Sequence, residues 1–159
     1  MSTQAAFQYI QDTSFAISLG QLNPLFGIGA QLFHISGLIL VLTPILLVNL
    51  RLLGKGLIGI SIPELVKITN PFVWLGLVFL VLSGLFMLIP SASLYEPNPA
   101  FWLKMKILAV ALIIQFSLYR QVTKTESPNH WLAIVTAILS LVLWFAVGLT
   151  GRAIGFVAA

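Results

Sequence analysis

The chain has 159 residues, of which 59% are hydrophobic and only 8% are charged. Soluble domains carry about 25% charged residues, and a core of this size cannot bury so much apolar surface, so the composition excludes an ordinary soluble domain and indicates a lipid bilayer. The absence of cysteine excludes disulfides and thiolate metal sites. The net charge of +4 comes without a basic, aromatic-interleaved cluster, so we expect no nucleic-acid partner.

Residues 1–24 form the first expected unit, an N-terminal amphipathic segment. Phe7, Ile10 and Ile17 fall roughly on one helical face, whereas Asp12 falls elsewhere on the wheel. This pattern is typical of a short helix that lies along a membrane surface or against a neighbour. No positive charge precedes an apolar run here, so the segment is not expected to be a cleaved signal peptide.

The second expected unit, residues 25–159, contains four apolar segments of membrane-spanning length. A hydrocarbon core of about 30 Å needs about 20 helical residues, and the segments that meet this requirement are 25–50, 71–89, 101–120 and 130–149. Pro44 predicts a kink in the first span. Pro63 and several glycines predict a non-helical connection between the first two spans. The fold class is therefore all-α, an integral membrane four-helix bundle.

Basic residues predict the orientation of the bundle. They flank the first and third connections, as Arg51, Lys55, Lys67, Arg120 and Lys124. The positive-inside rule then places these connections in the cytoplasm and both termini outside. Lys104, Lys106 and Arg152 argue for the opposite orientation, but the two lysines lie near the outer end of the third span, where long side chains can reach back to the headgroups.

His34 is the histidine within the length of a span, whereas His130 stands at the first position of the fourth span. An ionisable side chain at membrane depth costs free energy unless it has a partner, so it marks a candidate functional site. It belongs to a stripe of small residues with alternating spacings of three and four, which consists of Gly27, Ala30, His34, Gly37 and Val41. Gln31 lies one turn before the histidine on the adjoining side.

The stripe has two possible uses. In the first, small residues let another helix approach closely and His34 forms a hydrogen bond across the interface. In the second, Ala30 and Gly37 clear space for a tetrapyrrole whose metal takes the His34 imidazole, with Gln31 beside it. The spacing from Ala30 to His34 resembles the pigment-ligating helix of bacterial light-harvesting polypeptides, so haem b or chlorophyll is the alternative to no cofactor. His130 lies too far away in depth to share an iron with His34.

No catalytic or metal-binding constellation is expected. All the acidic residues fall outside the spans, as Asp12, Glu64, Glu96 and Glu126, which disfavours an enzyme, a pump or a transporter. Glycines instead predict helix-packing faces. One face is at Gly27 in the first span, and the other follows the fourth span and its tail at Gly148, Gly151 and Gly155, of which the last two have the GxxxG spacing.

Motifs along most of the chain resemble an uncharacterised bacterial family of small four-helix membrane proteins, a domain of unknown function. They are "LFHISG", "NLRLLG", "NPFVWLGLVFLVLSGLFM", "NPAFWLKMKIL" and "LSLVLWFAVGLTGR". The resemblance implies a bacterial inner membrane. The broader group is similar to copper-resistance and b-type cytochrome membrane domains, which implies a redox or metal context. Three positions depart from the pattern, because Gln31 and Asn49 stand where acids are expected and Tyr119 stands near an expected histidine.

The function predicted from these features is a non-catalytic integral membrane subunit. It packs within a larger membrane assembly, either as a homo-oligomer or as an accessory subunit of a redox or photosynthetic complex. The alternative is a tetrapyrrole-binding membrane protein with His34 as the axial ligand.

Overall fold

The computed structural model describes residues 2–157 and is helical throughout its regular elements. The long helices are α3 (Pro24–Leu52), α4 (Ile62–Leu88), α6 (Pro99–Ile114) and α8 (His130–Val157). A π-helical segment, η2 (Gln115–Tyr119), and the short α7 (Arg120–Thr123) continue α6 to the next connection. Among the described residues, four helices are long and apolar enough to cross a membrane, so the predicted four-helix membrane fold is confirmed.

Polar caps decide where the long helices begin. The side-chain oxygens of Asn23, Ser61, Asn98 and Asn129 each accept a hydrogen bond from a first-turn backbone N–H. Pro63 lies in the first turn of α4. Backbone N–H groups in a first turn have no carbonyl partner within the helix, so proline is tolerated there. The prediction that Pro63 breaks the helix was therefore wrong, and α4 begins at Ile62 rather than at residue 71.

The other predicted spans differ from the observed helices mainly at their ends. The helix α3 covers Pro24–Leu52 rather than 25–50, with Pro44 inside it. The third span runs from Pro99 to Thr123, through η2, rather than over 101–120. The helix α8 continues to Val157 instead of ending at 149, because no proline interrupts its glycine-containing tail.

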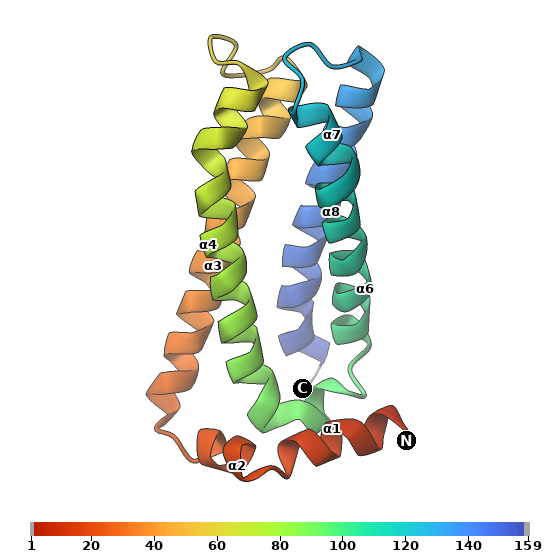
Figure 1. Ribbon diagram of the computed structural model, residues 1–159. Helices are drawn as coiled ribbons and strands as arrows, with labels where there is room; N and C mark the ends of the chain where they lie inside the picture. Colours follow the sequence, from red (N-terminus) through yellow and green to blue (C-terminus); the bar gives the residue numbers. More distant parts are fainter. Residues whose placement is uncertain (1, 158–159) are drawn as a thin grey trace.

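The bundle consists of two helix pairs (Figure 1). The helix α3 packs along α4, α6 packs along α8, and contacts between α3 and α8 join the pairs, whereas α4 and α6 barely touch. The closest approach of α3 and α4 is at two glycines. A Cβ atom on Gly37 would lie 2.9 Å from the Gly76 carbonyl oxygen, and one on Gly76 would lie 2.7 Å from that of Gly37. Neither position can accept a side chain without moving the helices apart.

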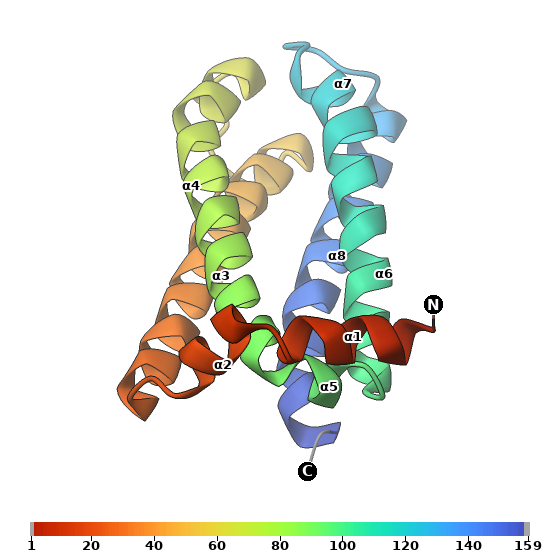
Figure 2. The ribbon, with the colours of Figure 1, turned by 60° about the horizontal axis from the view of Figure 1, so that its bottom comes forward.

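The N-terminal segment forms two helices, α1 (Thr3–Gln11) and α2 (Ser14–Gly20), rather than the single expected helix. The break has a clear cause, because the Thr13 side chain caps α2 by accepting from the Ala16 N–H at 3.2 Å. Together α1 and α2, called the collar below, cross one end of the bundle beneath α5 (Ala92–Tyr95) (Figure 2). The last turns of α8 lie at this same end.

Side-chain contacts hold the collar in place. The Thr3 hydroxyl donates to Glu96 Oε1 at 3.0 Å, and Gln11 Oε1 accepts from the Ser93 N–H at 2.8 Å. The Phe7 ring packs edge-on against Phe101, with ring centroids 6.1 Å apart. The amphipathic segment is thus docked on the connection between α4 and α6.

Candidate functional site

The His34 side chain reaches from α3 to α4. Its Nδ1 atom lies 2.9 Å from the Ser83 hydroxyl oxygen. The Ser83 hydroxyl donates its own proton to the Phe79 carbonyl oxygen of α4, so it acts as the acceptor for His34. A neutral imidazole in this arrangement carries its proton on Nδ1 and leaves Nε2 with a free lone pair.

Gly84 provides the space in which the imidazole lies. A Cβ atom on Gly84 would lie 3.5 Å from His34 Cε1, so the ring sits directly over this turn of α4. Ser83 is buried and His34 is half-buried. The histidine therefore contacts protein rather than projecting wholly into lipid. Its contacts on α4 are with residues 83 and 84.

Lys104 of α6 approaches the same site from the opposite helix pair. It is half-buried, whereas Lys106 is exposed. A Cβ atom on Gly151 would lie 3.5 Å from Lys104 Cε and 3.6 Å from its Nζ, so the lysine crosses α8 where that helix has no side chain. The Lys104 side chain thus packs against α8 at Gly151, whereas the expectation that it reaches the headgroups stays a prediction.

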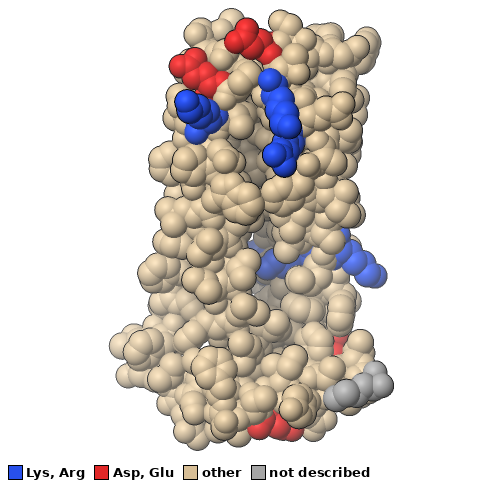
Figure 3. Space-filling model, in the orientation of Figure 1, with Lys and Arg blue, Asp and Glu red and all other residues tan. Residues whose placement is uncertain are grey.

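A hollow separates α4 from α6 at this level. The two helices barely touch along their length, and basic side-chain atoms are visible within a hollow part-way along the bundle (Figure 3). The acidic residues of the described chain lie at the two ends of the bundle, Asp12 and Glu96 at the collar end and Glu64 and Glu126 at the other end. The hollow therefore faces one cation without a counter-charge.

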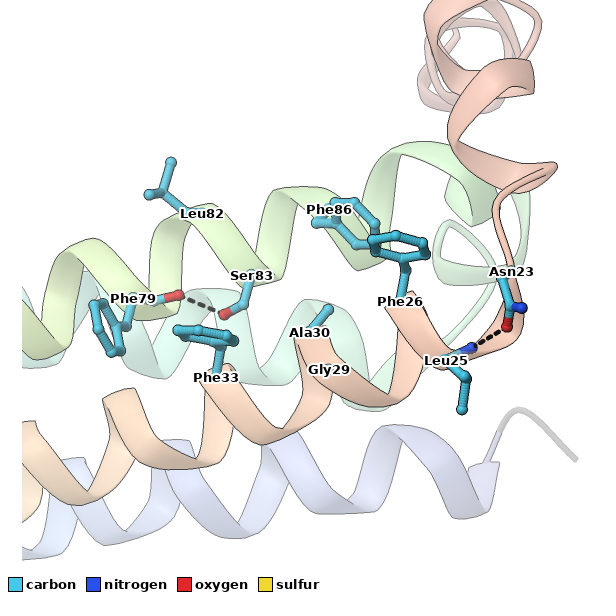
Figure 4. A pocket seen from close by; sticks show the side chains of 10 residues that line it. All are labelled: Asn23, Leu25, Phe26, Gly29, Ala30, Phe33, Phe79, Leu82, Ser83 and Phe86. Atoms are coloured by element: carbon cyan, nitrogen blue, oxygen red, sulfur yellow. Dashed lines mark hydrogen bonds between the residues drawn. The ribbon is translucent and has the colours of Figure 1, made fainter.

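A separate apolar groove of about 590 Å³ lies between α3 and α4 near the collar (Figure 4). Gly29 and Ala30 are among its lining residues, and aromatic rings dominate it, from Phe26, Phe33, Phe79 and Phe86. The Phe33 and Phe79 rings meet edge-on, with centroids 5.4 Å apart. Ser83 also lines the groove, so its hydroxyl lies between this groove and His34.

The chain matches the model of one protein family over residues 7–157, described as a family of unknown function (DUF6644). The chain belongs to this family. The expected membership of an uncharacterised family is thus confirmed, and the match includes most of the N-terminal segment. No curated protein and no solved structure matches the chain.

In this DUF6644 chain the predicted small-residue stripe does not act as one surface. Gly37 is covered by α4, Ala30 lines the aromatic groove, and Gly27 faces open space. Gln31 is exposed. The residues that the fold brings to His34 are instead Ser83, Gly84 and Lys104, which sequence reasoning did not connect with it.

The glycines of α8 contact side chains of the same chain. A Cβ atom on Gly148 would lie 3.5 Å from Leu38 of α3, and Gly151 accommodates Lys104, whereas Gly155 faces open space. His130 begins α8 at the opposite end of the bundle. The distance along α8 from His130 to Gly151 is roughly 30 Å at about 1.5 Å per residue, which separates the two histidines as the sequence predicted.

A second polar group joins α3 to α8 away from His34. The Asn49 amide nitrogen donates to the Ser140 hydroxyl at 3.0 Å, and all three of Asn49, Ser140 and Thr136 are buried. Asn49 Oδ1 and Thr136 Oγ1 have no hydrogen-bond partner within residues 2–157. Tyr119 is also buried in this half of the bundle, within the apolar cluster around Val48. Among the described residues, no three His, Cys, Asp or Glu side chains are grouped so that they could hold a metal ion.

Proposed function

We propose that this DUF6644 chain is a non-catalytic subunit of a larger membrane assembly in a bacterial inner membrane. The observation that carries the proposal is the His34–Ser83 hydrogen bond at 2.9 Å. A polar side chain at membrane depth that is paired within the chain serves to join helices, and such bonds recur between membrane helices. The positions of the acidic residues support the same reading, because Glu64 lies in the first turn of α4 and the others lie outside the long helices, whereas a proton relay or ion pathway needs ionisable groups at depth.

We place the assembly contact at the aromatic groove between α3 and α4. Gly29 and Ala30 give it a shallow floor, and Gly27 beside it has open space in front of it. Small residues at a membrane helix surface let a second helix approach closely. The partner helix belongs either to a second copy of this chain or to a subunit of a redox or photosynthetic complex.

Disulfide cross-linking tests this contact directly, because the chain has no cysteine of its own. A Gly27→Cys variant in native membranes should give a cross-linked species of higher mass, whose composition distinguishes a homo-oligomer from another subunit. Ile113→Cys, on the exposed face of α6, is the matched control. Absence of any adduct at Gly27, together with a monomeric particle in native nanodiscs, would contradict the proposal.

A tetrapyrrole-binding protein is the second candidate, and a specific feature of His34 favours it. Histidines that bind metals donate their other ring N–H to a second protein group, and here Nδ1 pairs with Ser83, so that in the neutral ring the lone pair is on Nε2. The motif resemblance to b-type cytochrome domains points the same way. Because Gly37 is closed off by α4, the ring would have to occupy the hollow beside Lys104. A haem iron or chlorophyll magnesium bound there would supply redox or light-absorbing chemistry.

A visible absorption spectrum of protein purified from its native membrane tests this candidate. A Soret band that disappears in His34→Ala and persists in His130→Ala would establish His34 as the ligand. Ser83→Ala should weaken retention of the tetrapyrrole, because it removes the hydrogen bond that orients the ring. A spectrum without visible bands would exclude the candidate.

A further inference from the structure

Lys104 is a cation that the fold directs into the membrane-spanning region. Its side chain lies over Gly151 of α8, where a Cβ atom would lie 3.6 Å from Nζ, so the ammonium is directed from α6 toward α8. A cation at this depth is costly unless it is paired. The acidic side chains of the described residues lie at the two ends of the bundle rather than at this level.

The surroundings of Lys104 add space but no negative charge. Gly151 has no side chain between Lys104 and α8, and His34 pairs with the uncharged hydroxyl of Ser83. The neighbouring Lys106 is exposed on the outer face of α6. Lys104 thus provides one positive charge at the hollow. One singly charged anion would neutralise it.

The position of the hollow determines how such an anion reaches it. Because α4 and α6 barely touch, the hollow between them opens laterally toward the acyl chains of the bilayer. At about 1.5 Å per residue, Lys104 lies about 8 Å along α6 from Pro99. It is therefore further into the bundle than the end at which α6 begins. A small anionic group at the end of an apolar chain can enter by this route with its chain remaining in lipid.

We propose that the hollow binds a fatty-acid carboxylate, which pairs with Lys104 while the acyl chain lies between α4 and α6. This assignment goes beyond the proposed subunit function and requires no metal or tetrapyrrole. The ammonium supplies charge-assisted N–H donors in a setting of low dielectric, where such bonds are strong. The carboxylate in turn supplies a counter-charge that no described residue places at this level.

Equilibrium dialysis of the full chain in a neutral detergent, with radiolabelled hexadecanoate, tests the proposal. Hexadecanoate should bind with a stoichiometry of one, and Lys104→Met should weaken binding at least tenfold, since a charge-assisted hydrogen bond is lost. Lys106→Met removes a similar charge from the exposed face of the same helix and should leave the affinity unchanged. Hexadecanol, which has the chain without the charge, should bind at least tenfold more weakly than hexadecanoate.

A second variant addresses the path of the lysine. Gly151→Leu fills the space over which Lys104 crosses α8 and should weaken hexadecanoate binding by a similar factor with the lysine still present. Circular dichroism melting of each variant verifies folding, and Lys104→Met should fold because it removes an unpaired charge from the bilayer.

Three outcomes would overturn the proposal. The first is equal affinity of the Lys104→Met and Lys106→Met variants for hexadecanoate. The second is equal affinity of the native chain for hexadecanol and hexadecanoate. The third is displacement of hexadecanoate by equimolar phosphatidylglycerol, which would assign the hollow to a phospholipid phosphate instead.

Discussion

The His34 imidazole and the Ser83 hydroxyl are 2.9 Å apart and link α3 to α4. Ser83 is also bonded to its own helix through the Phe79 carbonyl oxygen, so its hydroxyl is held in place before His34 reaches it. A fixed acceptor orients the imidazole without requiring any group outside the chain. The same contact therefore serves both candidate functions, as a helix link in one and as the orienting partner of a ligand in the other.

A double-mutant cycle measures how much this link stabilises the bundle. We expect a coupling free energy of about 1 kcal/mol between His34→Ala and Ser83→Ala, because interhelical hydrogen bonds in membranes contribute about 0.6–2 kcal/mol. The measurement is the free energy of unfolding in mixed micelles. Ser36→Ala, at an exposed position of α3, should change it by less than about 0.5 kcal/mol. Additive effects of the two substitutions would show that the bond contributes nothing.

The glycine pair between α3 and α4 gives a second prediction. Gly76→Ala should destabilise the bundle by about 1–3 kcal/mol, because the new Cβ would lie 2.7 Å from the Gly37 carbonyl oxygen and the helices would have to separate. Gly29→Ala adds the same methyl group to α3 where nothing lies within 4 Å. It should be neutral or stabilising by up to about 1 kcal/mol from helix propensity. Equal thermal stability of the two variants would contradict this account.

The sequence predicted the number and type of the long helices because apolar length alone determines which segments can cross a bilayer. It failed at boundaries, where one polar side chain decides the outcome. Ser61 and Pro63 start α4 early, and Thr13 divides the N-terminal segment. The periodicity of apolar residues does not reveal single capping hydrogen bonds. In the structure, each of these bonds lies at the residue where a helix begins.

The candidate site was only half predictable for a related reason. His34 is conspicuous as a lone ionisable group in an apolar span, but its partner Ser83 lies 49 residues away and looks like an ordinary mid-span serine. The contact between Gly151 and Lys104 could not be predicted either. A GxxxG spacing predicts that another helix packs closely, and not that a lysine side chain lies against the glycine. Which helices become neighbours depends on tertiary packing, and one amphipathic pattern does not specify it.

The buried contact between Asn49 and Ser140 supports a third prediction. Ser140→Ala should cost about 1–2 kcal/mol of unfolding free energy, because it leaves the Asn49 amide buried without an acceptor. The double variant Asn49→Leu with Ser140→Ala removes both polar groups and should unfold within about 1 kcal/mol of the native chain. Unfolding in mixed micelles distinguishes the two. A double variant less stable than Ser140→Ala would mean that Asn49 has a role beyond this bond.

The docking of the collar leads to a fourth prediction. Phe7→Ala should detach α1 from the bundle, since the ring packs on Phe101 and on Trp102 at centroid distances of 6.1 Å and 5.9 Å. Amide hydrogen exchange in α1 should then become at least tenfold faster. Tyr9→Ala, where the native side chain is 69% exposed, should leave exchange unchanged. Similar exchange in both variants would show that the membrane surface, and not the bundle, holds the collar.

The orientation of the chain is the fifth prediction, and it depends on charges at the two ends of the bundle. Five basic residues lie in or beside the connections before α4 and before α8, at one end of the bundle, whereas the collar end has Asp12 and Glu96. The positive-inside rule therefore predicts that Thr125→Cys, in the connection before α8, reacts with a membrane-impermeant maleimide only after the membrane is opened. Ser93→Cys, exposed at the collar end, should react in intact bacterial spheroplasts. The native chain has no cysteine and supplies the unlabelled background. The reverse labelling pattern would place both termini in the cytoplasm, which would mean that Lys104, Lys106 and Arg152 outweigh the basic connections.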